Sequence, residues 1–342
     1  MPPPGRGGAG QAAGRRTGAR GANAGRRWAG GGEHAVGPAV TVLAGIAGLA
    51  VGSFLNTFID RWPREEPVTF PPSRCEHCGR RLRPLEMVPV ASWIVLRGRC
   101  RTCGGAIGWQ APLVESVTGL LFAAVAAAAG TPAQLLLGLG FVAVLVAVTG
   151  VDLRCQLIPN VALLAGLGWA ALVVLALVVP GPWAGWLAAP VAPASLEGAG
   201  AGAFAVPGPD EPAPASAATP SAPLIRPPAV APGWASWARA LGAAAVGGLI
   251  FQILRWGSRG GLGFGDVKLA AWLGFYLGPR ALPVALFTAA ILGGLVAAVL
   301  LLTGRRGRRD VIPFGPFLAA GGLVGWFFGE GLWQAYLGLG TG

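Results

Sequence analysis

The chain has 342 residues, of which 54% are hydrophobic and only 12% are charged, and its mean hydropathy is +0.60. Soluble domains usually carry about 25% charged residues, so the composition excludes an ordinary soluble protein and predicts a multi-pass membrane protein. The net charge of +12 comes almost entirely from arginine, because Lys268 is the only lysine. These arginines lie in loops and in the tail without interleaved aromatic residues that could stack on bases. We therefore expect a lipid bilayer, and no nucleic acid, as the partner of this charge.

Residues 1–35 consist largely of Gly, Ala and Arg and are expected to be a disordered tail, because they offer too little apolar surface to fold. No compact apolar core with a cleavage site follows the charges, so the tail does not resemble a signal peptide. Beyond it, about eight apolar stretches of roughly 20 residues predict an all-α, polytopic membrane helix bundle. The first helix is expected in 36–60, helices two to four in 111–180, and helices five to eight in 234–338. The spans are predicted at 37–59, 112–130, 132–151, 161–180, 235–256, 267–278, 282–303 and 313–338.

Two segments interrupt the apolar pattern. Residues 61–110 form a polar insert with nine arginines, and 181–233 are so rich in Pro and Ala that we expect a disordered linker. The insert and the basic loop 304–310 lie on the same side when eight spans are counted. Loops rich in Lys and Arg face the cytoplasm, so we expect that side to be cytoplasmic. The six arginines of the tail would then lie outside, and we give the two internal loops more weight.

Two aspartates are expected at the cytoplasmic edge of the membrane. Asp152 ends the third span, in VDLRCQLIPN (151–160), and Asp266 begins the sixth, in GLGFGDVKL (261–269). Ionisable groups in membrane segments are costly and indicate function. Two adjacent carboxyl groups share one proton and can then act as an acid and a base, as in aspartic proteases. Gly263 and Gly265 would let a backbone approach Asp266 closely.

From spacing alone, two structural alternatives to catalysis stay open. Asp266 could cap a helix, whose dipole would also favour the ionised form, and Asp152 could form a surface ion pair with Arg154. Glu115 could bind substrate, serve methyl transfer or form an interfacial salt bridge. Lys268 could bias the ionisation of Asp266 or reach the headgroups. Glu330 is interpreted as an interfacial residue.

The insert contains two C-x-x-C pairs separated by 21 residues, which is typical of a four-cysteine zinc site. The cytoplasm disfavours disulfides, and neighbouring arginines would stabilise thiolates. A redox role is the alternative, and His77 and Cys155 are expected to be bystanders. The predicted ligands of this structural zinc are Cys75, Cys78, Cys100 and Cys103.

GLGFGDVKL resembles the G-x-G-D signature of membrane aspartic peptidases, and most closely that of the prepilin peptidases, also called type IV leader peptidases. Six further stretches are similar to the same family in order, and the likeness covers about 48–180 and 236–320. They are GSFLNTFIDRWP (52–63), SRCEHCGRRL (73–82), PVASWIVLRGRCRTCGGAI (89–107), PLVESVTGLLF (112–122), DLRCQLIPN (152–160) and IPFGPFLA (312–319).

The resemblance implies a bundle of about eight helices in the bacterial inner membrane, with Asp152 and Asp266 as catalytic residues at the cytoplasmic face. It implies cleavage of the leader from type IV prepilin or pseudopilin precursors after a glycine. Because the cysteine insert marks the longer form of the family, it also implies methylation of the new N-terminus with S-adenosylmethionine. The sequence carries no nucleotide-binding fingerprint, so the residues that bind this cofactor are unknown.

Two alternative functions remain. A G-x-G-D peptidase without methylation could act on other membrane peptides, although the cysteine insert and IPFGPFLA count against it. A non-catalytic transporter or scaffold could use the aspartates to relay protons or to cap helices. That function predicts further ionisable groups along the spans, and the sequence has few.

Overall fold

The computed structural model describes residues 37–70, 72–179, 181–189, 225, 227–228, 234–258, 261–304 and 312–339. These residues form helices, with two isolated β-bridges in the insert and no strand. The predicted all-α fold is therefore confirmed. The predicted tail, the loop 305–311 and most of the predicted linker lie outside the described residues.

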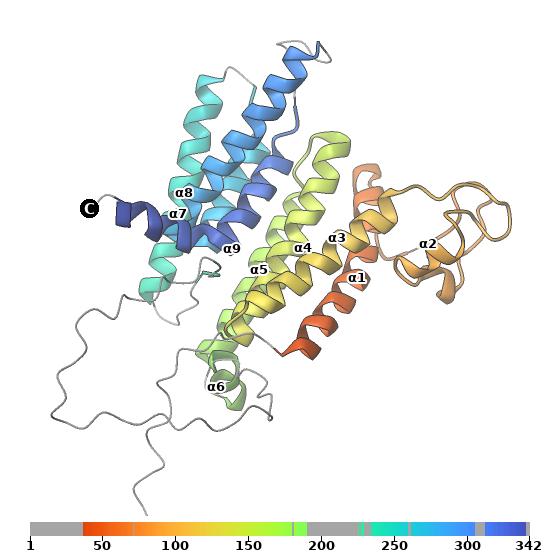
Figure 1. Cartoon of the computed structure of the whole chain (residues 1–342), viewed down its shortest axis with the longest axis horizontal. Helices are drawn as coiled ribbons and strands as arrows, with labels where there is room; N and C mark the ends of the chain where they lie inside the picture. Colours follow the sequence, from red (N-terminus) through yellow and green to blue (C-terminus); the bar gives the residue numbers. More distant parts are fainter. Residues whose placement is uncertain are drawn as a thin grey trace, which may run out of the picture. The chain divides into compact units, whose positions relative to one another are not determined.

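Every predicted apolar segment corresponds to helix (Figure 1). Two short 3₁₀ helices lie in the insert, at Trp62–Arg64 and Pro84–Met87. The α-helices are α1 (Pro38–Arg61), α2 (Ala91–Val95), α3 (Gln110–Ala128), α4 (Pro132–Cys155), α5 (Asn160–Val178), α6 (Pro182–Ala188), α7 (Trp234–Gly257), α8 (Phe264–Leu302) and α9 (Gly315–Leu339).

Six of these helices are long and apolar enough to cross a membrane, namely α1, α3, α4, α5, α7 and α8. The prediction of about eight spans differs from this number for two reasons. The segments 267–278 and 282–303 are counted together as α8, but they are two helical parts that meet at a kink at Gly278, where φ is 71°. The eighth segment is α9, which is glycine-rich, carries Glu330 and is not among the six.

The predicted linker 181–233 begins with structure, because α6 occupies its first residues. Leu187 of α6 is 5% exposed and belongs to the main apolar core. The helix contacts α4 and α5. The first described part of the predicted linker is therefore a short helix that belongs to the bundle.

Close backbone contacts at small residues hold the bundle together. A Cβ atom added to Gly48 of α1 would lie 2.8 Å from the Gly119 Cα of α3. One added to Gly274 of α8 would lie 2.4 Å from the Ala243 carbonyl oxygen of α7. Helices in lipid associate through such close packing, because lipid tails leave no hydrophobic drive between them. These contacts define two groups of helices, α1 with α3, and α7 with α8 and α9.

The first half of α8 is bonded to α5 by two aromatic side chains. Trp272 Nε1 donates to the Leu163 carbonyl at 3.1 Å, and the Tyr276 hydroxyl donates to the Gly166 carbonyl at 2.6 Å. Trp272 also stacks on Phe141 of α4, with ring centroids 5.3 Å apart. These contacts fix the beginning of α8 relative to the end of α4, where the two predicted acids lie.

Candidate active site and cysteine cluster

Asp152 lies in the last turn of α4 and is only 4% exposed. Its Oδ2 accepts a hydrogen bond of 2.9 Å from the Gly315 backbone N–H, at the start of α9. A Cβ on residue 315 would lie 2.6 Å from that same oxygen, so only glycine fits without displacement. Arg154 does not pair with Asp152; its guanidinium contacts Asp60 at 2.6 Å. The surface ion pair considered for Asp152 is therefore absent from the structure.

Asp266 is the third residue of α8 and is 8% exposed. Its Oδ2 accepts the Gly263 backbone N–H at 3.1 Å, and Gly263 is the N-cap residue. The capping considered for Asp266 thus exists in a modified form, since a third-position acid that bonds back to the N-cap N–H is half of a capping box. In the first turn, the helix dipole favours the anionic carboxylate.

The two motifs around the acids are in direct contact. A Cβ on Gly265 would lie 2.9 Å from the Ile158 Cβ, so this glycine lets the segment after Asp152 reach the start of α8. Lys268 Nζ donates to Asn160 Oδ1 at 2.9 Å and lies 4.7 Å from the centre of the Phe264 ring. Lys268 therefore joins α8 to the beginning of α5, which neither sequence hypothesis about it anticipated.

The end of α4 that carries Asp152 and the beginning of α8 that carries Asp266 lie side by side, since Gly265 contacts Ile158 in the segment that follows Asp152. In each aspartate, Oδ2 accepts one backbone N–H from a glycine, and Oδ1 has no hydrogen bond to the described part of the chain. Each acid is thus oriented by the backbone and keeps one oxygen available for water or substrate. This arrangement can support acid and base catalysis by a pair of carboxyl groups.

A polar network beside Asp152 was not predicted. Gln110 at the start of α3 donates to Asn56 Oδ1 at 2.7 Å and to Asp60 Oδ1 at 3.1 Å. Arg154 donates to Gln110 and pairs with Asp60. The network joins the ends of α1, α3 and α4 two residues beyond the first acid. GSFLNTFIDRWP contains Asn56 and Asp60, but nothing in the spacing marked Gln110 as their partner.

Glu115 is 8% exposed, and its Oε2 accepts the Val90 backbone N–H at 2.7 Å. Val90 precedes α2 and has a φ of 59°, which is unusual for a β-branched residue. The structure records no salt bridge of Glu115 among the described residues. Its observed contact attaches the insert to α3.

The four predicted cysteines form one cluster, in which the Sγ atoms all lie within 4.8 Å of one another. The sulfurs of Cys75 and Cys103 are 3.8 Å apart. Two thiolates on a tetrahedral zinc ion, with Zn–S bonds of about 2.3 Å, lie about 3.8 Å apart. The cluster can therefore hold a metal ion of this kind.

Two equivalent turns build the cluster. The Gly79 N–H donates to the Cys75 carbonyl, and the Gly104 N–H donates to the Cys100 carbonyl, both at 2.9 Å. The two glycines have φ values of 66° and 70°, which other residues adopt only with strain. An isolated β-bridge closes each turn.

Local hydrogen bonds favour a thiolate in the cluster. Backbone N–H groups of Cys103 and Thr102 bond the Cys100 sulfur and lower its pKa to about 6. Arg80, among the arginines predicted to help, lies close enough for its positive charge to interact with the Cys100 thiolate, and it forms an ion pair of 2.8 Å with Glu86. His77 bonds the Ala106 carbonyl oxygen and Cys155 bonds the Val151 carbonyl, so neither belongs to the cluster.

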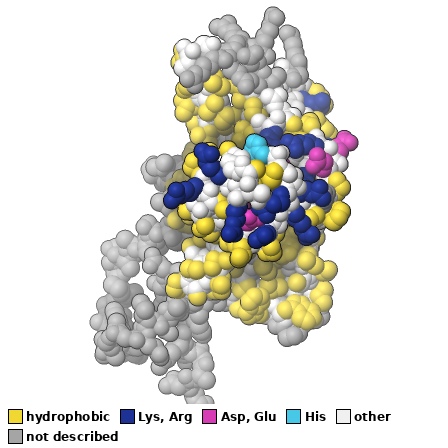
Figure 2. Space-filling model, turned by 90° about the vertical axis from the view of Figure 1, so that its right-hand side faces the viewer, with side chains coloured by type: hydrophobic (Ala, Val, Ile, Leu, Met, Phe, Trp, Pro, Cys, Tyr) yellow, Lys and Arg dark blue, Asp and Glu magenta, His cyan; other side chains and the backbone are white. Residues whose placement is uncertain are grey.

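Other arginines of the insert are exposed. Figure 2 shows Lys and Arg side chains gathered on one face of the molecule, with few acidic side chains among them. This basic face agrees with the expectation that the insert lies outside the hydrocarbon of the membrane. The exposed arginines of the insert are Arg64, Arg74, Arg81, Arg83, Arg97, Arg99 and Arg101.

Two family profiles match the chain. Residues 46–129 match the bacterial peptidase A24 N-terminal domain, and residues 219–298 match the type IV leader peptidase family. The first range contains the cysteine cluster and Glu115, and the second contains Asp266. Asp152 lies between the two matched ranges.

Curated relatives align across both ranges and the segment between them. The prepilin leader peptidase/N-methyltransferase of Bacillus subtilis (strain 168) is 30% identical over 297 residues, which are 87% of this chain and 98% of that protein. The protein of the same name from Burkholderia pseudomallei (strain 1026b) is 33% identical over 309 residues, covering 83% and 84% of the two chains. That from Aeromonas hydrophila is 31% identical over 322 residues, covering 84% and 91%. No solved structure matches the chain at a comparable significance.

Proposed function

We propose that this chain, which belongs to the family of prepilin leader peptidase/N-methyltransferases, removes the leader from type IV prepilin or pseudopilin precursors. The cleavage takes place at the cytoplasmic face of the bacterial inner membrane. The observation that carries the proposal is the juxtaposition of two buried aspartates, each held by a glycine N–H at one end of the bundle.

In the proposed reaction, Asp152 and Asp266 share one proton. The ionised carboxylate takes a proton from a water molecule, whose oxygen attacks the carbonyl carbon of the scissile glycyl bond. The protonated carboxyl group donates its proton to the carbonyl oxygen. The tetrahedral intermediate then collapses and the C–N bond breaks. The amine leaves with a proton from the acid pair, and one hydroxyl of the intermediate returns its proton to the pair, which again holds one proton. No covalent enzyme intermediate forms.

The buried polar groups favour this function over a transporter. In the described part of the chain, the buried polar or charged side chains are Glu115, Thr118, Asp152 and Asp266. Thr118 bonds within its own helix, and Glu115 bonds the insert. A proton relay needs a chain of ionisable groups that runs through the membrane. Here the two remaining buried acids, Asp152 and Asp266, lie together at one end of the bundle.

The orientation is supported by contacts as well as by charge. Hydrogen bonds join the end of α4 to the beginnings of α3 and α9, and Lys268 joins the beginnings of α5 and α8. The arginine-rich insert connects α1 to α3 at this same end. Basic loops face the cytoplasm, so the acid pair lies on the cytoplasmic side.

We further propose that Cys75, Cys78, Cys100 and Cys103 bind one structural zinc ion. The donor set and the sulfur spacing fit a closed tetrahedral site. Such an ion supplies folding energy and leaves no open position for a water molecule. It therefore braces the insert, and the hydrolysis depends on the aspartates alone.

N-methylation of the new N-terminus, with S-adenosylmethionine as donor, completes the proposed function. Its support is the name shared by the relatives and their alignment over most of this chain, including the insert. The residues that bind the methyl donor remain unassigned.

The proposal is tested by incubating purified protein with a candidate precursor and S-adenosylmethionine in detergent. Mass spectrometry should find that the leader is lost and that the new N-terminus carries one added methyl group. Asp152→Asn and Asp266→Asn should each reduce cleavage at least about a thousandfold while the protein remains folded. Glu330→Gln is the matched control, because Glu330 pairs with Arg280 at 2.7 Å, away from the acids. Cleavage that survives in either aspartate variant would exclude the acid pair.

A further inference from the structure

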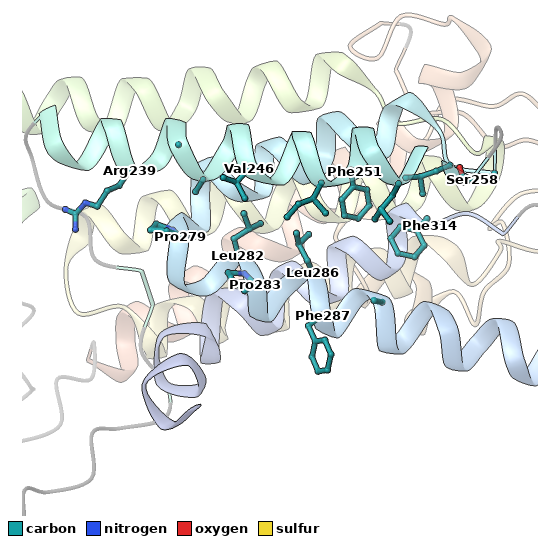
Figure 3. A pocket seen from close by; sticks show the side chains of 17 residues that line it. Arg239, Val246, Phe251, Ser258, Pro279, Leu282, Pro283, Leu286, Phe287 and Phe314 are labelled. Atoms are coloured by element: carbon teal, nitrogen blue, oxygen red, sulfur yellow. The ribbon is translucent and has the colours of Figure 1, made fainter. Parts of the chain in front are cut away.

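A largely apolar groove of about 910 Å³ runs between α7 and the second half of α8 (Figure 3). Arg239 and Ser258 lie at opposite ends of it, and the side chains between them are apolar. Its walls include Val246 and Leu254 on α7 and Phe287 on α8, which are 52%, 52% and 69% exposed.

The break in α8 creates this groove. The first half of α8 packs tightly on α7, since a Cβ on Gly247 would lie 2.6 Å from the Ala270 carbonyl oxygen. After Gly278, Pro279 and Pro283 lie near the start of the second half of α8, and side chains of this half and of α7 line the groove between them. The second half packs on α9 instead, where a Cβ on Gly321 would lie 2.2 Å from the Ala285 carbonyl oxygen. The face of α8 that looks toward α7 therefore stays open.

The length of the groove matches the thickness of a membrane. Arg239 and Ser258 are separated by about 28 Å along α7, at 1.5 Å per residue, and the hydrocarbon core of a bilayer is about 30 Å thick. A single lipid tail crosses only about half of that core. The groove thus has the dimensions of a complete membrane-spanning segment and exceeds those of one acyl chain.

One end of the groove adjoins the acid pair. Gly261 and Leu262 line this end and directly precede Gly263, whose N–H bonds Asp266. Phe314 lines the same end and precedes Gly315, whose N–H bonds Asp152. The wall of the groove is therefore continuous in sequence with both groups that orient the acids.

We propose that the precursor is anchored in the membrane by an apolar helix and that the groove binds this helix, with the scissile bond emerging at the end marked by Ser258 and Phe314. This inference rests on the proposed function, because it assigns a binding surface to the same substrate. A helix seated along α7 and the second half of α8 gains packing contacts across the whole membrane. Its cytoplasmic end then lies beside Asp152 and Asp266, which converts a bimolecular encounter into a positioned reaction.

The first test is photocrosslinking with the full-length Asp152→Asn protein, which holds the precursor without cleaving it. A p-benzoylphenylalanine replacing Phe287 should crosslink to the precursor's membrane segment, as identified by mass spectrometry. The same group replacing Leu249 is the control, because Leu249 lies on α7 with 58% exposure but does not line the groove. Equal yields from both positions, or adducts only with phospholipid or a second copy of this chain, would overturn the proposal.

The second test fills the groove in the active protein. Ala290→Trp should raise KM for the membrane-anchored precursor about tenfold and leave kcat near the wild-type value, because it removes binding without touching the acids. Leu249→Trp should leave both constants unchanged. If the wild-type protein cleaves the precursor and Ala290→Trp has an unaltered KM, the groove proposal fails and the peptidase proposal stands. If the wild-type protein cleaves no precursor, the proposed function fails, and crosslinking from Phe287 still decides whether the groove binds one.

Discussion

The acid pair and the cysteine cluster bring distant residues together by different means. Asp152 and Gly315 lie 163 positions apart, and packed helices hold their contact. Cys75 and Cys103 lie 28 positions apart in an insert of short turns, where Trp93 packs against Trp109 with ring centroids 4.2 Å apart. The bundle therefore supplies the geometry of the acids, while the insert has little apolar core, and we expect it to need a ligand to hold its thiols.

The claim that the packed bundle positions the acids is tested most strongly by changing Gly315. Gly315→Ala should lower kcat/KM about a hundredfold, because the added methyl group displaces Asp152 and small misplacements of reacting groups have effects of this size. Gly294→Ala on α8 is the matched control, since a Cβ there meets no atom within 4 Å. Cleavage assays on both variants provide the measurement. A Gly315→Ala protein with wild-type kcat/KM would show that this backbone contact does not position the acid.

Metal removal should affect the insert and spare the bundle. Cys100→Ser should abolish stoichiometric zinc and make the backbone N–H groups of Cys100 and Ile107 exchange rapidly, because their hydrogen bonds belong to the second turn. The long helices should keep their protection. Native mass spectrometry and hydrogen exchange measure the two effects. Cys155→Ser is the control, since that thiol lies outside the cluster; unchanged protection in Cys100→Ser would mean that the insert folds without metal.

The contact between Glu115 of α3 and Val90 of the insert, which joins the bundle to the insert, should have a smaller effect on stability when it is removed. Glu115→Ala leaves the Val90 N–H without its partner and should destabilise the attachment of the insert by about 1–3 kcal/mol. Glu115→Gln keeps an acceptor oxygen and should lose less. Hydrogen exchange of Val90 reports this local stability directly. Equal exchange rates in the wild type and in Glu115→Ala would show that the contact does not hold the insert.

The smallest expected change in the free energy of unfolding follows from replacing Lys268. Lys268→Met removes the bond to Asn160 and should lower the free energy of unfolding by about 0.5–1.5 kcal/mol, since the contact is exposed. A double-mutant cycle with Asn160→Ala, followed by thermal unfolding in detergent, isolates the pair. Additive losses would indicate that the two side chains do not stabilise each other.

The sequence was informative where chemistry depends on residue type and spacing. The two C-x-x-C pairs predicted the cluster, because both turns are local and each ends in a glycine of positive φ. The matched depth of Asp152 and Asp266 followed from counting spans. The gap between the predicted sixth and seventh spans coincides with the break at Gly278, since Gly-Pro disfavours a continuous helix.

Contacts between distant backbones could not be predicted in this way. Gly315 lies in IPFGPFLA, which was recognised as a block, but a backbone N–H that bonds a carboxylate leaves no mark in residue type. Gln110 similarly has no signature that points to Asp60 and Arg154. The groove depends on how far two helices diverge after Gly278, which hydropathy does not encode. Whether Asp152 and Asp266 catalyse cleavage stays a prediction until their variants are assayed.

Both acids are oriented by the backbone N–H groups of glycines, and such groups neither titrate nor carry a net charge near neutral pH. Protonation of a neighbouring side chain therefore cannot remove either support while the helices remain folded. A pH–rate profile of the enzyme should consequently report the titration of the two carboxyl groups themselves, as macroscopic values that belong to the pair. In a site whose acids are oriented by histidine or lysine side chains, the same profile would report two effects together: the titration of the catalytic carboxyl groups and the titration of the side chains that orient them.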